Sequence, residues 1–466
     1  MAKNAYLCNL IRNDTPNTAE TMLPLDFIDM MVPQMGTELD AFCRAIEQEP
    51  LVSVRLNNKT NAKSDILQLG KRVPWCESGY YLQARPQFTL DPWLHAGCYY
   101  VQEASSMFLE QVLRQYVRRD AIVLDMCAAP GGKSTLLSEH LTEGGLLISN
   151  EVVRQRVFIL SENIQKWGNG NTVVTHNQAK DFGERLPNLF DCILVDAPCS
   201  GEGMFRKDKQ AVDEWSERNV QMCAERQRKI LGDVWDALRP GGIMIYSTCT
   251  FNTKEDEENA QWIAEELGAE ILPVHTEPEW CITQTKGYHF YPHKVQGEGF
   301  YLCAFRKDDA PYTPFRPKTE KKKTAQAIEF EKEIRSWLQH PAQWALRQQE
   351  RFVNAYPLRH KELIDYLSTQ LICISTGIGL SEQRGKGVAP QHSLSMAKDL
   401  RQEAFSRVEV DKPTALSYLR QEAIVLDNQP VGILLLTYQG VALGFVKNIG
   451  GHCNNLYPKE WRIRVL

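Results

Sequence analysis

Short apolar segments alternate with longer amphipathic segments through the middle of the chain. Strand-like apolar runs occur at 121–124, 146–149, 172–175, 192–195 and 243–247. Helix-like segments lie between them, and from Val220 to Leu238 apolar residues recur close to every 3.6 positions. We expect this last helix to be stopped by Arg239-Pro240-Gly241-Gly242. Such alternation predicts an α/β fold, with a parallel sheet covered by helices on both faces.

The segments on either side of this region are less regular. Residues 1–88 combine helix-like LDFIDMMVPQM and ELDAFCRAIEQ with strand-like VSVRLN, which predicts an N-terminal α+β extension. A strand near 299–305 is expected to close the central region, 89–308. Residues 309–328 are typical of a basic linker. The remainder, 329–466, predicts a second α+β region whose ILLLTY and VALGFV strands are joined by Gln439-Gly440.

Composition limits the classes of function. A chain of 466 residues is long enough for two to four domains, and its net charge of −5 argues against indiscriminate coating of nucleic acid. A local basic groove remains compatible with RNA binding. Residues 314–326 carry five basic residues against one acidic residue, which is typical of a solvated linker or of part of an RNA platform.

Two further patterns concern location and metals. No apolar run reaches the roughly 18 residues that span a bilayer, and the first residues lack the apolar core of a secretory signal. We therefore expect no membrane partner and a cytoplasmic location. The 13 cysteines include no CxxC pair, which favours buried thiols in a reducing compartment and predicts no metal site.

Polar residues follow the expected strands: Asp125, Glu151, Asn177, Asp196 and Cys249. In a parallel sheet, ligands bind at the carboxyl ends of the strands. The loop after the first strand, DMCAAPGGK, matches neither GxGxxG nor GxxxxGK[ST], so neither a dinucleotide nor a nucleoside triphosphate is favoured. A glycine-rich turn with a carboxylate after the second strand is compatible with a nucleoside-bearing cofactor, and equally with an ordinary turn and a surface glutamate.

Two cysteines stand just after neighbouring strands. Cys199 lies in DAPCSGEG, three residues after Asp196, and Cys249 lies in STCT. A single cysteine is more often a buried core residue than a reactive one. The position of both thiols at strand ends favours a cleft instead.

Together these motifs resemble a known family. LDMCAAPGGKS, LVDAPCSGEG and YSTCTF, in this order and spacing, are similar to the central motifs of the Nol1/Nop2/Sun RNA cytosine-C5 methyltransferases. HAGCYYVQEASSM and FYPHKVQGEGFYLCAFRK also resemble that family, so the likeness covers about residues 20–308. The added C-terminal region is most similar to the bacterial ribosomal RNA small subunit methyltransferase F subgroup. There a PUA-like domain ends the chain, and LYPKEWRIR resembles its last strand.

The resemblance implies a Rossmann-like core that uses S-adenosylmethionine, and it implies catalytic roles. Cys249 would add to carbon 6 of cytosine, and Cys199 would assist release of the methylated base. Asp196 would hydrogen-bond near N3, where a buried position behind Pro198 would keep its carboxyl protonated. Lys133 would offset developing negative charge, or stand as a solvated residue in the first turn of its helix.

The cofactor contacts are implied in the same way. The loop residues Cys127, Ala128, Ala129, Pro130, Gly131, Gly132 and Lys133 would surround the methionine end of the cofactor. Glu151 would hold the ribose, and Asp196 would lie near the methyl group. Gln178 stands where the family usually has an aspartate near the adenine, with Asn177 and Asp181 as alternatives.

The expected function is formation of 5-methylcytosine in RNA, most of all ribosomal RNA or a ribosomal subunit assembly intermediate. The flanking regions would hold the RNA, and Trp75, Tyr99 or Tyr100 would stack on unpaired bases, unless they belong to the core. A transfer-RNA methyltransferase and an inactive RNA-binding assembly factor are the alternatives. A nicotinamide-dependent dehydrogenase is a poor third, because GxGxxG is missing.

Overall fold

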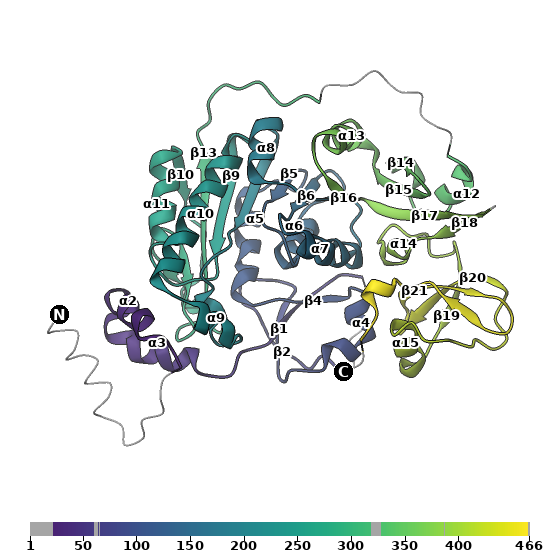
Figure 1. The fold of residues 1–466 in the computed structure, drawn as a ribbon, viewed down its shortest axis with the longest axis horizontal. Coiled ribbons are helices and arrows are strands. Elements are labelled where there is room, and N and C mark those ends of the chain that lie inside the picture. Colours follow the sequence, from purple (N-terminus) through teal and green to yellow (C-terminus); the bar gives the residue numbers. More distant parts are fainter. Residues whose placement is uncertain (1–21, 60–63, 65, 318–327, 386, 465–466) are drawn as a thin grey trace.

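A ten-stranded sheet forms the centre of the molecule (Figure 1). The computed structural model describes residues 22–59, 64, 66–317, 328–385 and 387–464. The middle of the sheet is parallel, in the order β7-β6-β5-β8-β9: β5 (Ile122–Asp125), β6 (Leu146–Asn150), β7 (Thr172–Thr175), β8 (Phe190–Asp196) and β9 (Leu238–Thr248). Antiparallel strands extend it: β10 (Ala269–Leu272), β11 (Thr283–Gln284), β12 (Tyr288–Phe290) and β13 (Phe300–Lys307) beyond β9, and β16 (Cys373–Thr376) beside β7. The predicted α/β class is confirmed.

Successive residues along the central strands are buried against different helices, as a pleated strand requires. Leu124, Ile193 and Met244 pack with α8 (Ala179–Arg185), α10 (Glu217–Trp235) and α11 (Glu257–Glu266). Val123 and Leu194 pack with α5 (Leu109–Tyr116) and α6 (Gly132–His140). The helix α7 (Arg154–Trp167) packs on Val174 of β7. Burial on both faces explains why these strands are almost continuously apolar.

One predicted boundary is wrong. The helix α10 ends at Trp235, and Arg239–Gly242 lie inside β9 rather than in a loop that stops the helix. The pairing of β8 with β9 is irregular there, between the Phe190–Leu238 and Cys192–Ile243 pairs. Proline and glycine are tolerated in a strand at such a bulge, because ladder hydrogen bonds are already interrupted.

The N-terminal region contains a small sheet and two helices that cover the central region. The sheet has the order β2-β3-β1-β4, from β1 (Ser53–Leu56), β2 (Leu69–Arg72), β3 (Gly79–Leu82) and β4 (Tyr99–Val101), and α4 (Pro92–His95) precedes β4. Because β4 belongs to this sheet, the sheet continues past the expected boundary at residue 88. The predicted helices are confirmed as α2 (Leu25–Met35) and α3 (Leu39–Ile46). Their Phe27 and Phe42 pack edge-on against Trp215 and Phe251.

The C-terminal region forms two further four-stranded sheets. One contains β14 (Trp344–Gln349), β15 (Phe352–Pro357), β17 (Ile378–Arg384) and β18 (Gly387–Pro390); the other contains β19 (Ser406–Glu409), β20 (Gly432–Tyr438), β21 (Val441–Asn448) and β22 (Cys453–Asn455). The helices are α12 (Glu331–Arg335), α13 (Lys361–Gln370), α14 (His392–Met396) and α15 (Lys412–Leu419). The ILLLTY and VALGFV strands are confirmed as β20 and β21. The expected strand in LYPKEWRIR is wrong: Lys459–Trp461 form a 3-10 turn, in which Trp461 packs on His392.

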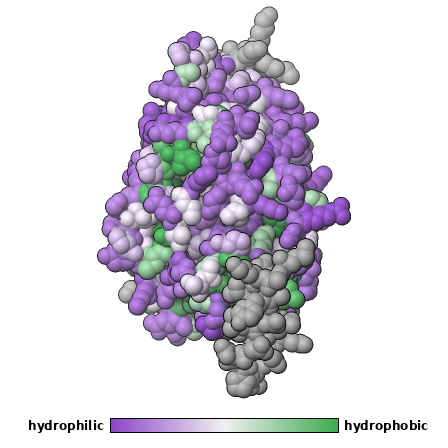
Figure 2. All heavy atoms as spheres, turned by 90° about the vertical axis from the view of Figure 1, so that its left-hand side faces the viewer, coloured by the Kyte–Doolittle hydropathy of each residue, from purple (hydrophilic) through white to green (hydrophobic). Residues whose placement is uncertain are grey.

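Residues 309–317 contain no helix or strand, and 318–327 lie outside the described residues, so most of the basic segment 314–326 stays a prediction. Figure 2 shows a mostly hydrophilic face with small, scattered hydrophobic areas. Among the described residues, no helix is long and apolar enough to cross a membrane.

Part of the C-terminal region is built into the central sheet. The strand β16 pairs with β7, and Figure 1 shows α13 next to this end of the sheet. Leu363, Ile364 and Leu367 of α13 are buried in the same core as α8 and α10. The central sheet therefore depends on residues that follow the linker.

We predict that Leu367→Ala lowers the free energy of unfolding by about 2–5 kcal/mol, because it leaves a cavity in the shared core. Denaturation in urea measures the change. Leu358→Ala, at a side chain that is 49% exposed, is the control and should change stability by no more than about 0.5 kcal/mol. Equal effects of the two substitutions would show that α13 is not part of the core of the central sheet.

Candidate active site

A buried carboxylate stands below the loop that follows β5. Asp125, the last residue of β5, is fully buried, and its Oδ2 accepts a hydrogen bond of 2.6 Å from Ser134 Oγ. Its Oδ1 is also buried and has no hydrogen-bond partner among the described residues. Burial raises the pKa of Asp125 to about 7. A buried acceptor without a partner is costly, so it suits a ligand that supplies a donor. In the sequence, the only sign of Asp125 is its place at the end of a strand.

Hydrogen bonds to and from neighbouring elements hold the loop itself. Ala128 N donates to Asn150 O at 2.8 Å, Arg156 donates to Ala129 O at 2.7 Å, and Asn163 donates to Pro130 O at 2.9 Å. Gly131 has a φ of 118°, a conformation open to glycine, and it turns the chain into α6 at Gly132. Burial raises the pKa of Cys127, which therefore stays a thiol. The first N–H groups of α6 are thus held beside Asp125.

The carboxylate after β6 is also buried. The side chain of Glu151 is 4% exposed, and its Oε1 accepts a hydrogen bond of 2.8 Å from Val153 N. Its Oε2 lies 3.6 Å from the guanidinium of Arg156. The carboxylate is held in place and keeps acceptor capacity for a hydroxyl donor, as the expected contact with a ribose would require.

The three residues considered for the adenine differ in what they already bind. Asn177 is paired with the C-terminal region, because Ile372 N donates to its Oδ1 at 3.2 Å. Asp181 accepts from Gln178 N at 3.0 Å and forms an ion pair of 2.8 Å with Arg185. Gln178 is exposed at the N-terminus of α8, and its side chain forms a capping box with Asp181. Of the three, Gln178 is therefore the most exposed, although its side chain already has a partner.

A lysine and an aspartate form an ion pair at the strand ends. Lys133 Nζ lies 2.8 Å from Asp196 Oδ2, and Ser247 Oγ donates to Asp196 Oδ1 at 2.7 Å. Burial opposes the charge of Lys133, but the charge and hydrogen bond of Asp196 outweigh it and raise the pKa of the lysine. Lys133 also lies 5.0 Å from the ring centre of Phe300. The expected burial of Asp196 is wrong, because its side chain is 31% exposed.

The two predicted cysteines are in contact. Cys199 Sγ and Cys249 Sγ lie 2.9 Å apart, at the ends of adjacent parallel strands, and both side chains are half-buried. The hydrogen bond with Cys249, together with burial, raises the pKa of Cys199 well above its usual value. Cys199 is therefore a thiol at neutral pH and can donate a hydrogen bond to Cys249.

Other expected contacts are not available. Trp75 and Tyr99 are each 2% exposed, so the alternative that they belong to the core is confirmed and they do not stack on RNA bases. Tyr100 is half-buried and lies near Gly132, where an added Cβ would come within 3.3 Å of its ring. Of the three aromatic residues, only Tyr100 borders the loop of the site.

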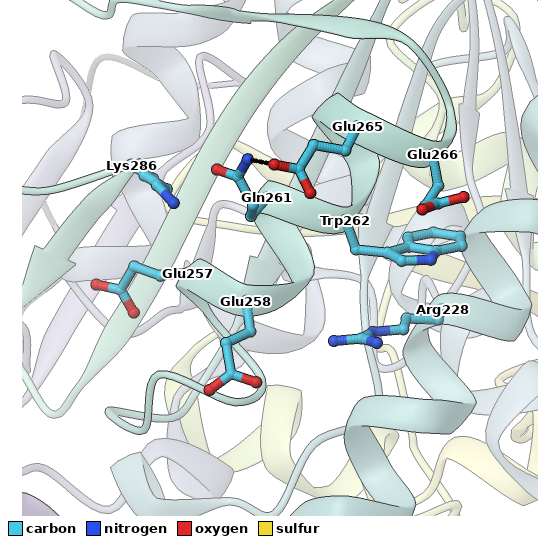
Figure 3. A pocket seen from close by; sticks show the side chains of 8 residues that line it. All are labelled: Arg228, Glu257, Glu258, Gln261, Trp262, Glu265, Glu266 and Lys286. Carbon is cyan, nitrogen blue, oxygen red and sulfur yellow. Dashed lines mark hydrogen bonds between the residues drawn. The ribbon is translucent and has the colours of Figure 1, made fainter.

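A separate cavity of about 300 Å³ lies on the outer side of α10 and α11. Figure 3 shows its lining: Arg228, Glu257, Glu258, Gln261, Trp262, Glu265, Glu266 and Lys286. None of these residues belongs to the predicted site, and the lining is mainly acidic, which does not suit RNA. Among the described residues, no group of three or more histidine, cysteine, aspartate or glutamate side chains could hold a metal ion.

Comparison with known proteins covers nearly the whole chain. Family models match residues 113–306 (16S rRNA methyltransferase RsmB/F), 23–104 (N-terminal domain of 16S rRNA methyltransferase RsmF) and 405–463 (methyltransferase RsmF PUA domain). The ribosomal RNA small subunit methyltransferase F of Aliivibrio fischeri is 31% identical, over 94% of this chain and 97% of that protein. The protein of that name from Erwinia tasmaniensis is 29% identical, over 95% and 98%.

Solved structures share the fold. A methyltransferase homologue from Pyrococcus horikoshii has a TM-score of 0.53 and 26% identity, over 62% of this chain and 99% of that one. NSun6 from Pyrococcus horikoshii, solved with SFG, has a TM-score of 0.52 and 19% identity, over 62% and 99%. Fold and site together define a Rossmann-like methyltransferase that carries a cysteine pair. The chain belongs to the 16S rRNA methyltransferase RsmB/F family, in its F branch.

The methyl donor of this methyltransferase is S-adenosylmethionine, and the residues present fit it. The unpaired Asp125 Oδ1 and the N–H groups at the start of α6 suit an ammonium and a carboxylate. Glu151 suits a diol. The donor and acceptor groups at the strand ends thus match those of an amino acid joined to a nucleoside.

We predict that Cys249→Ala lowers the pKa of Cys199, because it removes the hydrogen bond that raises that pKa most. Alkylation of Cys199 by iodoacetamide, followed by mass spectrometry over a range of pH, reports the change: the rise in rate should move to lower pH. The exposed Cys281 is the internal control and should react equally in both proteins. An unchanged profile of Cys199 would mean that the contact between the thiols does not set its protonation.

Proposed function

We propose that the chain methylates carbon 5 of a cytosine in small-subunit ribosomal RNA through a covalent adduct with Cys249. The observation that carries this proposal is the pair of thiols 2.9 Å apart, next to the Lys133–Asp196 ion pair. Carbon 5 of cytosine is a poor nucleophile, and addition of a thiolate at carbon 6 makes it reactive. The pair of thiols supplies one sulfur to attack and one to assist.

Addition is the step in which the charged residues act. The Cys249 thiolate forms a bond to carbon 6, and the ring takes on negative charge towards N3. Lys133, kept charged by Asp196, offsets this charge. Asp196, ionised in that pair, accepts a hydrogen bond from the amino group of the base next to N3. S-adenosylmethionine, held by the loop after β5 and by Glu151, would supply an electrophilic methyl group to carbon 5 and would leave as S-adenosylhomocysteine.

Release reverses the addition. Carbon 5 loses its proton to solvent, the bond between carbon 6 and sulfur breaks, and its electrons return to Cys249. Cys199, a thiol at neutral pH, donates a hydrogen bond to the departing sulfur and stabilises it as a thiolate. Without this donor the adduct should persist.

Support for ribosomal RNA comes from the relatives named ribosomal RNA small subunit methyltransferase F, which align over nearly the full length of the chain. The C-terminal match to a PUA domain supports a role of residues 405–463 in holding RNA. Transfer RNA is the second candidate substrate for the same reaction. An inactive assembly factor is less favoured, because the ion pair and both cysteines are in place.

We predict that Cys199→Ala accumulates a covalent protein–RNA adduct, whereas Cys249→Ala forms none. Each protein is incubated with cellular RNA and S-adenosylmethionine, denatured and run on a gel. In the same assay Cys249→Ala should lose methylation by about 10³-fold or more, as expected for a nucleophile. Sequencing the trapped RNA separates ribosomal from transfer RNA.

The reverse pattern in the gel would make Cys199 the nucleophile. Absence of an adduct from both variants, with an inactive wild-type protein, would favour the assembly factor.

We also predict that Glu151→Gln weakens S-adenosylmethionine binding by about tenfold, since it replaces a charged acceptor by a neutral one. Isothermal calorimetry measures the dissociation constant. Glu143→Gln, at an exposed glutamate shortly before the same strand, is the control and should bind like the wild type. Unchanged binding by Glu151→Gln would remove this residue from the ribose contact.

A further inference from the structure

Three carboxylates are buried behind the two cysteines. Glu202, Glu255 and Asp256 are each exposed by 1% or less. Glu202 lies in the loop after β8 that carries Cys199, and Glu255 lies in the loop after β9 that carries Cys249. Burying ionisable groups is costly unless they are well hydrogen-bonded. None of the three touches the Lys133–Asp196 pair through a described hydrogen bond or ion pair.

Glu202 binds the backbone of the opposite loop. Its Oε2 accepts hydrogen bonds from Phe251 N at 2.8 Å and from Asn252 N at 3.1 Å. Its Oε1 accepts from Trp215 Nε1 at 3.1 Å. The residue that follows, Gly203, donates its N–H to Cys249 O at 2.8 Å. The loop of Cys199 therefore holds the backbone on which Cys249 stands.

Glu255 forms the reciprocal contact. It accepts from Ser200 N at 3.1 Å and from Ser200 Oγ, one residue after Cys199. It also accepts from Gln227 Nε2 at 2.6 Å, and the same amide donates to Pro198 O at 3.0 Å. Asn252 Nδ2 joins the two carboxylates, at 2.8 Å from Glu202 and 2.9 Å from Glu255.

From this geometry we infer that Glu202 and Glu255 are positioning residues, which hold the Cys199 and Cys249 sulfurs in contact by bracing each cysteine loop against the other. Both oxygens of each glutamate face N–H or O–H donors, so a carboxylate fits and an amide does not. A glutamine would turn its own N–H₂ group towards at least one donor and lose those bonds. The inference rests on the proposed roles of the cysteines and adds two residues that touch neither base nor cofactor.

The contact between the sulfurs can be followed without any methylation assay. The hydrogen bond between the thiols contributes most to the raised pKa of Cys199, so a looser pair lets Cys199 ionise at lower pH. We predict that Glu202→Gln and Glu255→Gln increase the rate of Cys199 alkylation by iodoacetamide at pH 8 by roughly threefold or more, through a larger thiolate fraction. The binding of S-adenosylmethionine should stay unchanged, while the turnover number of any methylation falls about tenfold or more.

Comparing each variant in two backgrounds separates an effect on the contact between the sulfurs from an effect of the glutamate charge on the pKa of Cys199. The charge of Glu255 itself raises the pKa of Cys199, and this effect survives in a Cys249→Ala protein, whereas an effect on the contact between the sulfurs cannot. We expect Glu202→Gln to speed Cys199 alkylation in the wild-type background and to leave it unchanged in Cys249→Ala. An equal acceleration in both backgrounds would overturn the inference.

Two further variants keep the test decisive. Ile263→Ala, at a buried position of α11 that belongs to neither loop, lowers stability and should not change Cys199 alkylation. If it does, alkylation follows general loosening and the inference falls. If Glu202→Gln does not fold, Asn252→Ala removes the amide that joins the carboxylates, together with the acceptor of Glu255 N, and should give a smaller change in the same direction. An inactive wild-type protein with the expected alkylation pattern would contradict the proposed function, but it would support the positioning role of Glu202 and Glu255.

Discussion

The pairing of β8 with β9 is the constraint on which the site depends. Asp196 stands opposite Ser247 in this parallel pair, and the two hydrogen-bond across it. Each strand is followed within three residues by a cysteine, so sulfurs 50 residues apart in sequence come into contact. The long helix α10 makes the crossover that lets β9 lie parallel to β8. The contact between the two sulfurs is thus set by the order and direction of the strands, and not by the cysteine residues alone.

The apolar runs and the polar residues after them were sufficient to predict the parallel strands and the place of the two cysteines at their ends, because buried parallel strands leave a strong pattern. Lys133 was indicated only by the resemblance to a known family. Asp125 was overlooked as a site residue, since an unpaired buried oxygen depends on contacts that a sequence does not display. The side chain of Asn177 accepts a hydrogen bond from Ile372, 195 residues further on. Asp196 likewise has its ion-pair partner, Lys133, on another element. Apart from two local errors, at the end of α10 and in LYPKEWRIR, what escaped prediction was long-range pairing.

The flanking regions do more than extend the molecule. The helices α2 and α3 place Phe27 and Phe42 against Phe205 and Phe251, and these last two residues lie a few positions after Cys199 and Cys249. Aromatic pairs of this kind stabilise a core by more than the burial of their area alone. The N-terminal helices therefore share one core with the loops that bear the thiols, and their attachment contributes to the rigidity of the site.

The strand β16 has a geometrical consequence for a large substrate. It joins β7 through backbone pairing, and Ser375 Oγ contacts Ser161 Oγ of α7 at 3.1 Å. A body attached by a shared strand and a shared core cannot swing as it would on a flexible tether. An RNA gripped by the C-terminal sheets would therefore be held at a fixed distance from the two sulfurs. The protein would then select its target nucleotide by its distance from the RNA segment that the C-terminal sheets bind, and the bases next to the target would matter less.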